Sequence, residues 1–196
     1  RNVTAATTNL TNWFVNGTSW TVLNMPFEGG SNATFTRDYS GTNNSGVNNG
    51  SVNGATFLSA SGVGNSGAYN FSNNHINITP LNLTNLGTTF ALSTWIKTTN
   101  TSLMSVAGAF EASSGRNGFR LNTRNVAGGV WFQVGTGNSA DNAQCTNCTY
   151  NQGAWHHLVG VYNGSNVILY FDGRIGGNVA STRTVNTSVN FTIGKT

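Results

Sequence analysis

The chain has 196 residues, and only 7% of them are charged, against about a quarter in an ordinary soluble domain. Its net charge of +4 comes from nine Lys and Arg residues scattered singly, which argues against a nucleic-acid-binding stripe. No apolar run approaches about 18 residues, so no transmembrane segment or intact signal peptide is expected; one domain with one core fits the length. Because the first residue is Arg1 rather than Met, we expect a processed, mature product.

Asn-x-Ser/Thr glycosylation sequons recur along the whole chain, more often than its composition alone explains. N-glycans, or burial of the surface in an assembly, would keep such a weakly charged surface from self-associating, and both indicate an extracellular or cell-surface protein. The alternative is an Asn- and Thr-rich surface produced by drift, with most sites unused. The predicted glycosylation sites are Asn2, Asn9, Asn16, Asn32, Asn43, Asn49, Asn70, Asn77, Asn82, Asn100, Asn147, Asn163, Asn186 and Asn190.

The predicted elements begin with a short β-favouring run in an N-terminal extension of residues 1–17, with Leu10, Trp13, Phe14 and Val15 as its apolar members. Helix signals are nearly absent from residues 18–196, where Gly, Asn and Thr interrupt short apolar runs. This pattern predicts an all-β protein, a two-sheet antiparallel β-sandwich. Residues 41–55, rich in Gly, Asn and Ser, are predicted to be a loop.

Strands are predicted next at residues 90–97, 119–121 and 130–134, and the clearest signal lies in residues 155–173. There, two alternating apolar runs flank Asn163 and Gly164, a pair suited to a tight hairpin turn. Both faces of this hairpin are apolar, which predicts a central position in its sheet. Trp95 and Trp155 fall within strands and are predicted to lie in the core.

Cys145 and Cys148 are separated by two residues. In a cytosolic protein this spacing is typical of redox chemistry or of half a zinc site, but the chain has no second ligand pair. Together with the sequon at Asn147, the spacing favours a small loop disulfide formed in an oxidising compartment.

Several segments occur in the order and at the spacing of the LamG-like jelly roll of the concanavalin A-like lectin superfamily, which residues 18–196 therefore resemble. These segments are Met25-Pro26-Phe27-Glu28, Asp38-Tyr39-Ser40-Gly41, Gly67-Ala68-Tyr69-Asn70-Phe71, FALSTWIKT at 90–98, GAWHHLVGVYNGSNVILYFDG at 153–173 and FTIG at 191–194. The resemblance implies a jelly-roll sandwich. The superfamily contains glycosidases, lectins, calcium-binding adhesion modules and structural domains, so the fold does not fix the function.

Catalysis is not expected, because a glycosidase needs two carboxylates flanking the scissile bond. The acidic residues are not clustered as in the hydrolases of the superfamily; they are Glu28, Asp38, Glu111, Asp141 and Asp172. His156 and His157 are neighbours in a strand, so they point to opposite faces, and one of them is predicted to be a core histidine with a satisfied ring nitrogen.

The resemblance also implies two kinds of ligand. LamG-like relatives often bind Ca²⁺ at the loop edge, and Asp38 is the candidate ligand here; its alternative role is to brace its own turn by side-chain-to-backbone bonds. A lectin would need an exposed aromatic side chain and a few fixed polar groups to bind carbohydrate. Trp13 and Trp20 are the tryptophans expected to be freer, and no residue is marked as a sugar platform.

LamG-like domains normally add a closing strand after the segment that resembles FTIG, and no such strand follows at 195–196. A sandwich without that strand exposes an apolar groove that another chain can fill. We therefore expect the run at Leu10, Trp13, Phe14 and Val15 to be a donor strand for the next copy, which would build a head-to-tail surface fibre. The alternatives are an extension that folds back on its own domain or frays, and a lectin-like or adhesion module of a larger protein.

Overall fold

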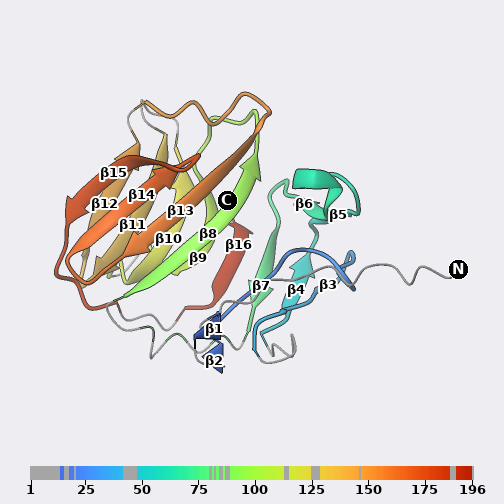
Figure 1. Cartoon of the computed structure of the whole chain (residues 1–196), viewed down its shortest axis with the longest axis horizontal. Helices are drawn as coiled ribbons and strands as arrows, with labels where there is room; N and C mark the ends of the chain where they lie inside the picture. The colour runs from blue at the N-terminus through green and yellow to red at the C-terminus, as the bar shows by residue number, and fades with distance from the viewer. Residues whose placement is uncertain are drawn as a thin grey trace, which may run out of the picture.

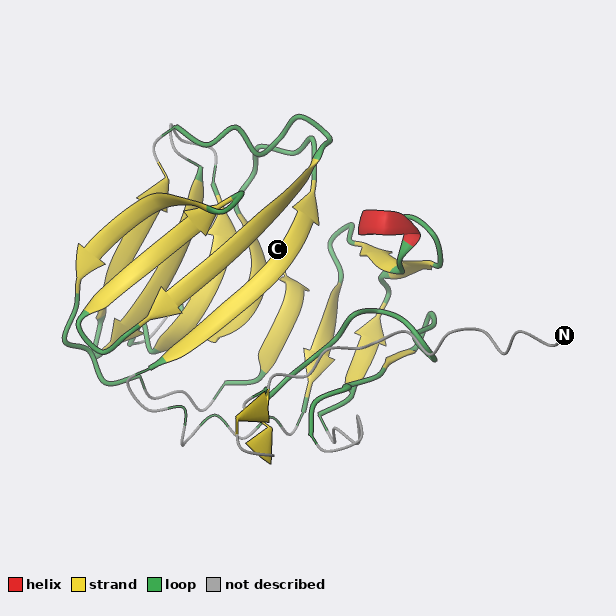
Figure 2. Cartoon of the chain, in the orientation of Figure 1, coloured by secondary structure: helices red, strands yellow, loops and turns green. Residues whose placement is uncertain are grey.

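The protein is described here from a computed structural model. The residues it describes are 14–15, 18–19, 21–41, 48–79, 81, 83, 86, 89–112, 115–124, 129–145, 147–185 and 189–195. They form an antiparallel β-sandwich, and the one helical element among them is the short 3-10 turn η2 (Val63–Asn65), drawn in red in Figure 2 and near β5 (Thr56–Leu58) and β6 (Ala68–Asn70) in Figure 1. No helix among these residues is long and apolar enough to cross a bilayer. The predicted sandwich is therefore confirmed.

One layer is a four-stranded sheet in the order β15-β14-β13-β8, seen in front in Figure 1. Its strands are β8 (Phe90–Lys97), β13 (Trp155–Tyr162), β14 (Asn166–Phe171) and β15 (Arg174–Ala180). The predicted hairpin is β13–β14, paired from Leu158 with Phe171 to Tyr162 with Val167. It has a neighbour on each side, so its predicted central position is confirmed.

The second layer is an eight-stranded sheet in the order β12-β11-β10-β9-β16-β7-β4-β3. Four strands form a meander: β9 (Met104–Phe110), β10 (Gly118–Thr123), β11 (Val130–Thr136) and β12 (Ser139–Cys145). Three shorter strands form the other end: β3 (Phe35–Thr36), β4 (Gly50–Asn53) and β7 (His75–Ile78). Strand β16 (Phe191–Lys195) lies between β9 and β7 and joins the two groups (Figure 1).

The core fills the space between the sheets, where alternate side chains of each strand point inward. Leu121 and Phe132 of the large sheet and Leu158 and Leu169 of the small sheet are fully buried. The small sheet covers only the meander. Beyond it, Ile76 is buried in the same core cluster as side chains of the segment before β3 and of the β5–β6 hairpin. Two minor hairpins lie outside the two sheets. Those hairpins are β5 (Thr56–Leu58) with β6 (Ala68–Asn70), and β1 (Phe14–Val15) with β2 (Thr18–Ser19).

Two sequence predictions are wrong. Residues 50–53 are not loop: they form β4, because one buried apolar side chain, Val52, suffices where Gly50 packs under Ile76. Trp95 and Trp155 are not in the core. Trp95 is 49% exposed and Trp155 is half-buried, since the alternation of β8 and β13 turns both side chains to the outer face of the small sheet.

The predicted disulfide between Cys145 and Cys148 is confirmed, and it closes the end of β12. Exposed and buried positions alternate at the start of β16. Asn190 is exposed, Phe191 is buried, and Ile193 packs against the core.

Candidate functional site

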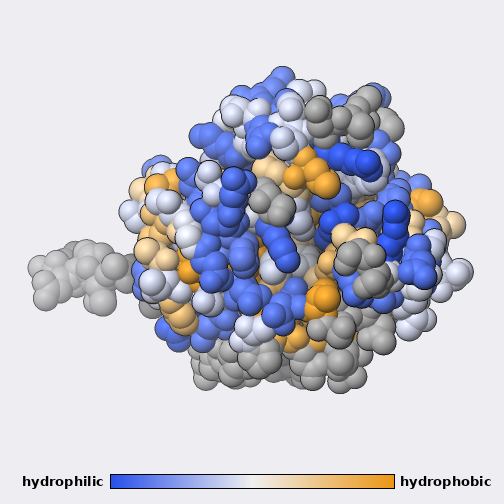
Figure 3. Space-filling model, turned by 180° about the vertical axis from the view of Figure 1, so that it is seen from behind, coloured by the Kyte–Doolittle hydropathy of each residue, from blue (hydrophilic) through white to orange (hydrophobic). Residues whose placement is uncertain are grey.

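A hollow of about 370 Å³ lies on the outer face of the large sheet, over strands β9 to β12. Figure 3 views the molecule from this side, where mostly hydrophilic side chains surround small hydrophobic patches. The volume falls in the range of roughly 300 to 1,000 Å³ typical of small-molecule sites. We call this hollow the arginine pocket; its lining residues are Leu103, Phe110, Ala112, Arg116, Arg120, Asn122, Arg124, Trp131, Gln133 and Asn142.

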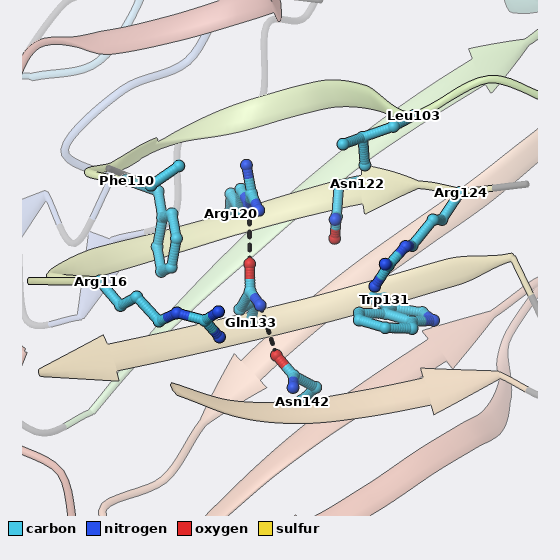
Figure 4. A pocket seen from close by; sticks show the side chains of 10 residues that line it. Leu103, Phe110, Arg116, Arg120, Asn122, Arg124, Trp131, Gln133 and Asn142 are labelled. Carbon is cyan, nitrogen blue, oxygen red and sulfur yellow. Dashed lines mark hydrogen bonds between the residues drawn. The ribbon is translucent and has the colours of Figure 1, made fainter. Parts of the chain in front are cut away.

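The strand register brings the polar floor of the pocket together. Arg120 of β10 lies opposite Gln133 of β11, which in turn lies opposite Asn142 of β12. Arg120 Nε donates to Gln133 Oε1 at 2.7 Å, and Gln133 Nε2 donates to Asn142 Oδ1 at 2.6 Å (Figure 4). Gln133 is only 5% exposed. Both ends of its amide are therefore held, and the row is a fixed hydrogen-bonded chain.

The walls pair cations with aromatic rings. The Arg120 guanidinium lies over the Phe110 ring, 4.5 Å from its centroid, and that of Arg124 lies over Trp131 at 4.7 Å. Such contacts stabilise a cation without neutralising its charge. They also hold the two guanidinium groups at the pocket wall (Figure 4).

The pocket concentrates positive charge in a chain that has little charge elsewhere. Burial, followed by repulsion from Arg116 and Arg124, lowers the pKa of Arg120. No carboxylate is among the described residues that line the pocket, although Glu111 stands in the sequence between two lining residues, Phe110 and Ala112. Other carboxylates bind groups away from the pocket. Asp141 accepts two hydrogen bonds from Arg183, Glu28 Oε1 accepts the Gly67 N–H, and Asp172 pairs with His156.

Two polar atoms of the pocket are buried without a partner in the described part of the chain, Asn122 Oδ1 and Trp131 Nε1. Asn122 is 1% exposed. The two residues face each other across β10 and β11, one offering an acceptor and the other a donor. A buried polar group without a partner is costly, so a small molecule carrying hydroxyl groups would satisfy both atoms.

Asp38, the predicted calcium ligand, is fully buried among protein donors. Its Oδ1 accepts the N–H groups of Asn24 and Ser40, and its Oδ2 accepts the Ser40 hydroxyl and the Asn48 N–H. This environment does not fit a calcium ligand, since both oxygens brace the backbone. Among the described ranges, no three His, Cys, Asp or Glu side chains group as a metal site.

His156 and His157 lie on opposite faces, as predicted. His156 is the core histidine: its Nδ1 lies 2.8 Å from Asp172 Oδ2 and its ring stacks on Phe171, although its Nε2 has no partner among the described residues. Burial opposes ionisation of Asp172, but the hydrogen bonds from His156 and the His157 N–H outweigh it and lower its pKa. Because Asp172 Oδ1 accepts the backbone N–H of His157, it does not orient the His157 ring.

On the outer face of the small sheet, His157 stacks on Trp95 at 4.8 Å between ring centroids. His157 Nε2 also lies 2.8 Å from the Ser93 hydroxyl, a contact that the sequence did not indicate. Ser93 and His157 resemble the first two members of a hydrolytic triad, but Asp172 contacts only the backbone of His157. Trp95 and His157 therefore form a small aromatic surface patch on the outer face of the small sheet.

The remaining predicted sites are only partly described. Sequons at Asn32, Asn70, Asn100, Asn147, Asn163 and Asn190 are exposed, and those at Asn49 and Asn77 are half-buried. Asn2, Asn9, Asn16, Asn43, Asn82 and Asn186 lie outside the described residues. So do Leu10, Trp13 and Trp20, whereas Phe14 and Val15 pair with Ser19 and Thr18 in the β1–β2 hairpin.

The arginine pocket was missed in the sequence because its residues come from four strands. Arg116, Arg120 and Arg124 recur every four residues in the sequence, but each is a single charge among uncharged residues, so the sequence did not indicate that they share a site. One signal in the sequence pointed toward the pocket: Asn142 and Gln144 are polar residues on the same face of β12. Without the pairing to β11, the sequence did not show whether this face points to the core or to solvent.

Comparison with known proteins gives a family. The profile of the concanavalin A-like lectin/glucanases superfamily matches residues 66–196. Domain 4 of AbnA, a GH43 extracellular arabinanase from Geobacillus stearothermophilus, in complex with arabinotriose, is similar with a TM-score of 0.62 at 14% identity over 84% of both chains. No curated protein matches the sequence.

Two other similar structures are of longer chains, and this chain matches less than half the length of each. The binding domain of botulinum neurotoxin DC in complex with SialylT has a TM-score of 0.53 at 14% identity, over 81% of this chain and 40% of that one. Domains LG4-5 of the mouse laminin alpha1 chain have a TM-score of 0.45 at 18% identity, over 55% of this chain and 28% of theirs. At these identities the likeness concerns the fold.

Proposed function

Because the chain belongs to the concanavalin A-like lectin/glucanase superfamily, we propose that it is a non-enzymatic, lectin-like or adhesion module that binds carbohydrate in the arginine pocket. The proposal includes an extracellular or cell-surface location. The disulfide and the many sequons support this location, since both belong to oxidising, secretory compartments.

The observation that carries the proposal is a pair of buried pocket atoms, Asn122 Oδ1 and Trp131 Nε1, that have no hydrogen-bond partner among the described residues. A sugar hydroxyl donates one hydrogen bond and accepts others, so a single ring can serve both atoms. The fold is also compatible with sugar binding, as two structures that share it are complexes with arabinotriose and with SialylT.

The first test is a glycan array followed by titration calorimetry on its hits. Trp131→Phe removes the Nε1 donor and keeps a ring beneath Arg124, so it should weaken sugar binding about fivefold, the value of one hydrogen bond. Asn122→Ala should have a similar effect. Trp95→Phe, the same change on the opposite face, is the matched control and should leave affinity unchanged.

Two outcomes would contradict the proposal. If Trp95→Phe weakens binding while Trp131→Phe does not, the exposed patch of Trp95 and His157 is the sugar site. If no glycan binds, the module does not act through carbohydrate.

A second candidate function is a subunit of a surface fibre, and the open edge of β8 favours it. Among the described strands, β8 has one neighbour, β13. Its inward side chains Phe90, Leu92 and Ile96 are only half-buried, whereas Leu158 of β13 is fully buried. A strand added beside β8 would cover them and pair its free backbone groups.

The proposed donor is the run Leu10, Trp13, Phe14 and Val15 of another copy, which would make the partner a second molecule of this protein. Phe14 and Val15 are paired within their own hairpin, so donation requires that the β1–β2 hairpin opens. Deleting residues 1–17 should abolish filaments in electron micrographs, while Trp131→Phe should leave them unchanged. Filaments of normal length after the deletion would exclude this donor.

A further inference from the structure

We propose that the arginine pocket selects sugars that carry an oxyanion, either a carboxylate or a sulfate ester. This inference rests on the proposed sugar binding and names its ligand class. Three properties of the pocket support it: unneutralised guanidinium groups, N–H donors of these groups that are not used within the described residues, and a separate polar end that suits the sugar ring.

The first property is the treatment of charge. Elsewhere in the structure Arg183 has a bidentate partner, with Nε 2.7 Å and Nη2 3.0 Å from the two oxygens of Asp141. In the pocket, the described residues give Arg116, Arg120 and Arg124 no carboxylate partner. Three like charges that repel one another at a partly buried site are unfavourable alone, and a bound anion removes that cost.

The second property is the set of unused donors. Arg120 Nε donates its hydrogen bond to Gln133, and within the described residues its two Nη groups have no acceptor. In that part of the chain the guanidinium groups of Arg116 and Arg124 have no hydrogen-bond acceptor either. Since the amide of Gln133 is held at both ends, the groups left to bind an anion are guanidinium N–H groups. Their forked geometry suits bidentate contact with carboxylate or sulfate oxygens.

The third property is the division of the pocket. In Figure 4, Arg116, Arg120 and Phe110 lie toward one end, and Asn122, Trp131 and Arg124 toward the other. The unpartnered Asn122 Oδ1 and Trp131 Nε1 belong to the second end. An anionic sugar can therefore place its charged group among the guanidinium groups and its ring hydroxyls beside Asn122 and Trp131.

The test uses the full chain and a panel of tetrasaccharides. Each of several backbones is present in three forms, with a neutral hydroxymethyl group, a carboxylate or a sulfate ester at the same carbon; inorganic sulfate serves as a sugar-free arm. Titration calorimetry should show that one or both charged forms bind at least about tenfold more tightly than the neutral form, as expected for charge-assisted hydrogen bonds. The carboxylate and sulfate arms distinguish the two sources of the oxyanion.

Variants locate the effect. Arg116→Gln and Arg124→Gln should each weaken binding of the charged form about tenfold, and each should weaken binding of the neutral form less than that of the charged form. Arg174→Gln removes the same charge from an exposed residue of β15 and is the matched control. Thermal unfolding of each variant verifies that it is folded.

The outcomes separate this inference from the proposed function. Equal binding of all three forms, with Trp131→Phe still weakening it, would keep the lectin proposal and overturn the oxyanion inference. Binding of inorganic sulfate alone, lost in Arg116→Gln, would keep an anion site and overturn the lectin proposal. Charged-form binding that falls equally in Arg174→Gln would show a general charge effect and overturn the inference.

Discussion

Arg183 fastens the segment after β15 to the β11–β12 hairpin. Besides its two bonds to Asp141, its guanidinium donates to the Thr136 carbonyl at 3.2 Å and to the Ser139 hydroxyl at 2.8 Å. The hydrogen bonds from Arg183 lower the pKa of Asp141 and outweigh the opposing effect of burial. A depressed folded pKa means that the stabilisation is complete above the unfolded value of about 3.9 and is lost as pH falls through the folded value.

We therefore predict that Asp141→Asn lowers the free energy of unfolding at pH 7 by about 2 kcal/mol, the scale of a charged hydrogen-bonded pair. The difference from the parent protein should shrink as pH drops below about 4. Urea unfolding across a pH series measures it. Ser139→Ala removes a neutral partner of the same guanidinium, so its cost should not vary with pH; a similar pH trend in both variants would contradict the assignment.

Individual residues show where sequence reasoning succeeds and where it stops. The disulfide at Cys145 and Cys148 and the opposed faces of His156 and His157 follow from local spacing. The floor of the arginine pocket does not, because Arg120 and Gln133 become neighbours only through strand register. For Asp38 the sequence left two roles open, a calcium ligand or a brace of its own turn, and in the structure its carboxylate accepts N–H groups from three stretches of backbone.

At the scale of the element, β13 depends on the absence of a side chain at Gly160. A Cβ placed there would lie 2.2 Å from Cδ2 of Phe132, which is fully buried in the facing sheet. The ring of Phe132 thus packs directly on the β13 backbone, and the two sheets approach closely at this point.

Gly160→Ala should destabilise the protein by about 2 to 3 kcal/mol, because Phe132 is enclosed and has little room to move. Gly173→Ala is the comparison: it has a φ of +78° but no atom within 4 Å of the added Cβ, so strain alone should cost about 1 kcal/mol. Urea unfolding of both variants gives the difference. Equal costs would mean that the core at Phe132 adjusts freely.

Strands with long alternating apolar runs, such as β8 and the β13–β14 hairpin, could be predicted from the sequence. β15 could not, because Gly176 and Gly177 resemble a turn. In the structure they let β15 approach β12, where added Cβ atoms would meet Cys145 and Gln144. The glycines are thus explained by contact between sheet edges, which a one-dimensional pattern does not contain.

At the scale of the whole molecule, the described sequons avoid both outer faces that carry candidate ligand-binding surfaces. Neither the strands of the small sheet nor β9–β12 contain one. In three exposed sequons, at Asn32, Asn100 and Asn163, the side-chain oxygen accepts the backbone N–H of the third sequon residue, so this hydrogen bond does not involve the Nδ2 atom. Asn77 differs: its strand lies between β4 and β16 and its Oδ1 is buried.

We predict that the exposed sequons carry N-glycans in the native protein and that Asn77 does not. Peptide mass mapping after enzymatic deglycosylation measures the occupancy of each site. Asn100→Gln should remove the mass of one glycan and Asn77→Gln none. A glycan found regularly at Asn77 would contradict its place on a central strand.

The position of β16 sets an order of events during synthesis. The meander β9–β12 forms from neighbouring chain, but the large sheet is joined only when Phe191 pairs with Ile78 and Ile193 with Ala107. Until the ribosome has delivered residues 191–195, β7 and β9 each present an open edge to other nascent chains. Such long-range pairing is slow and leaves an interval open to aggregation. Glycans attached to the N-terminal half of the chain during that interval would shield the two groups of strands while they are not yet joined by β16.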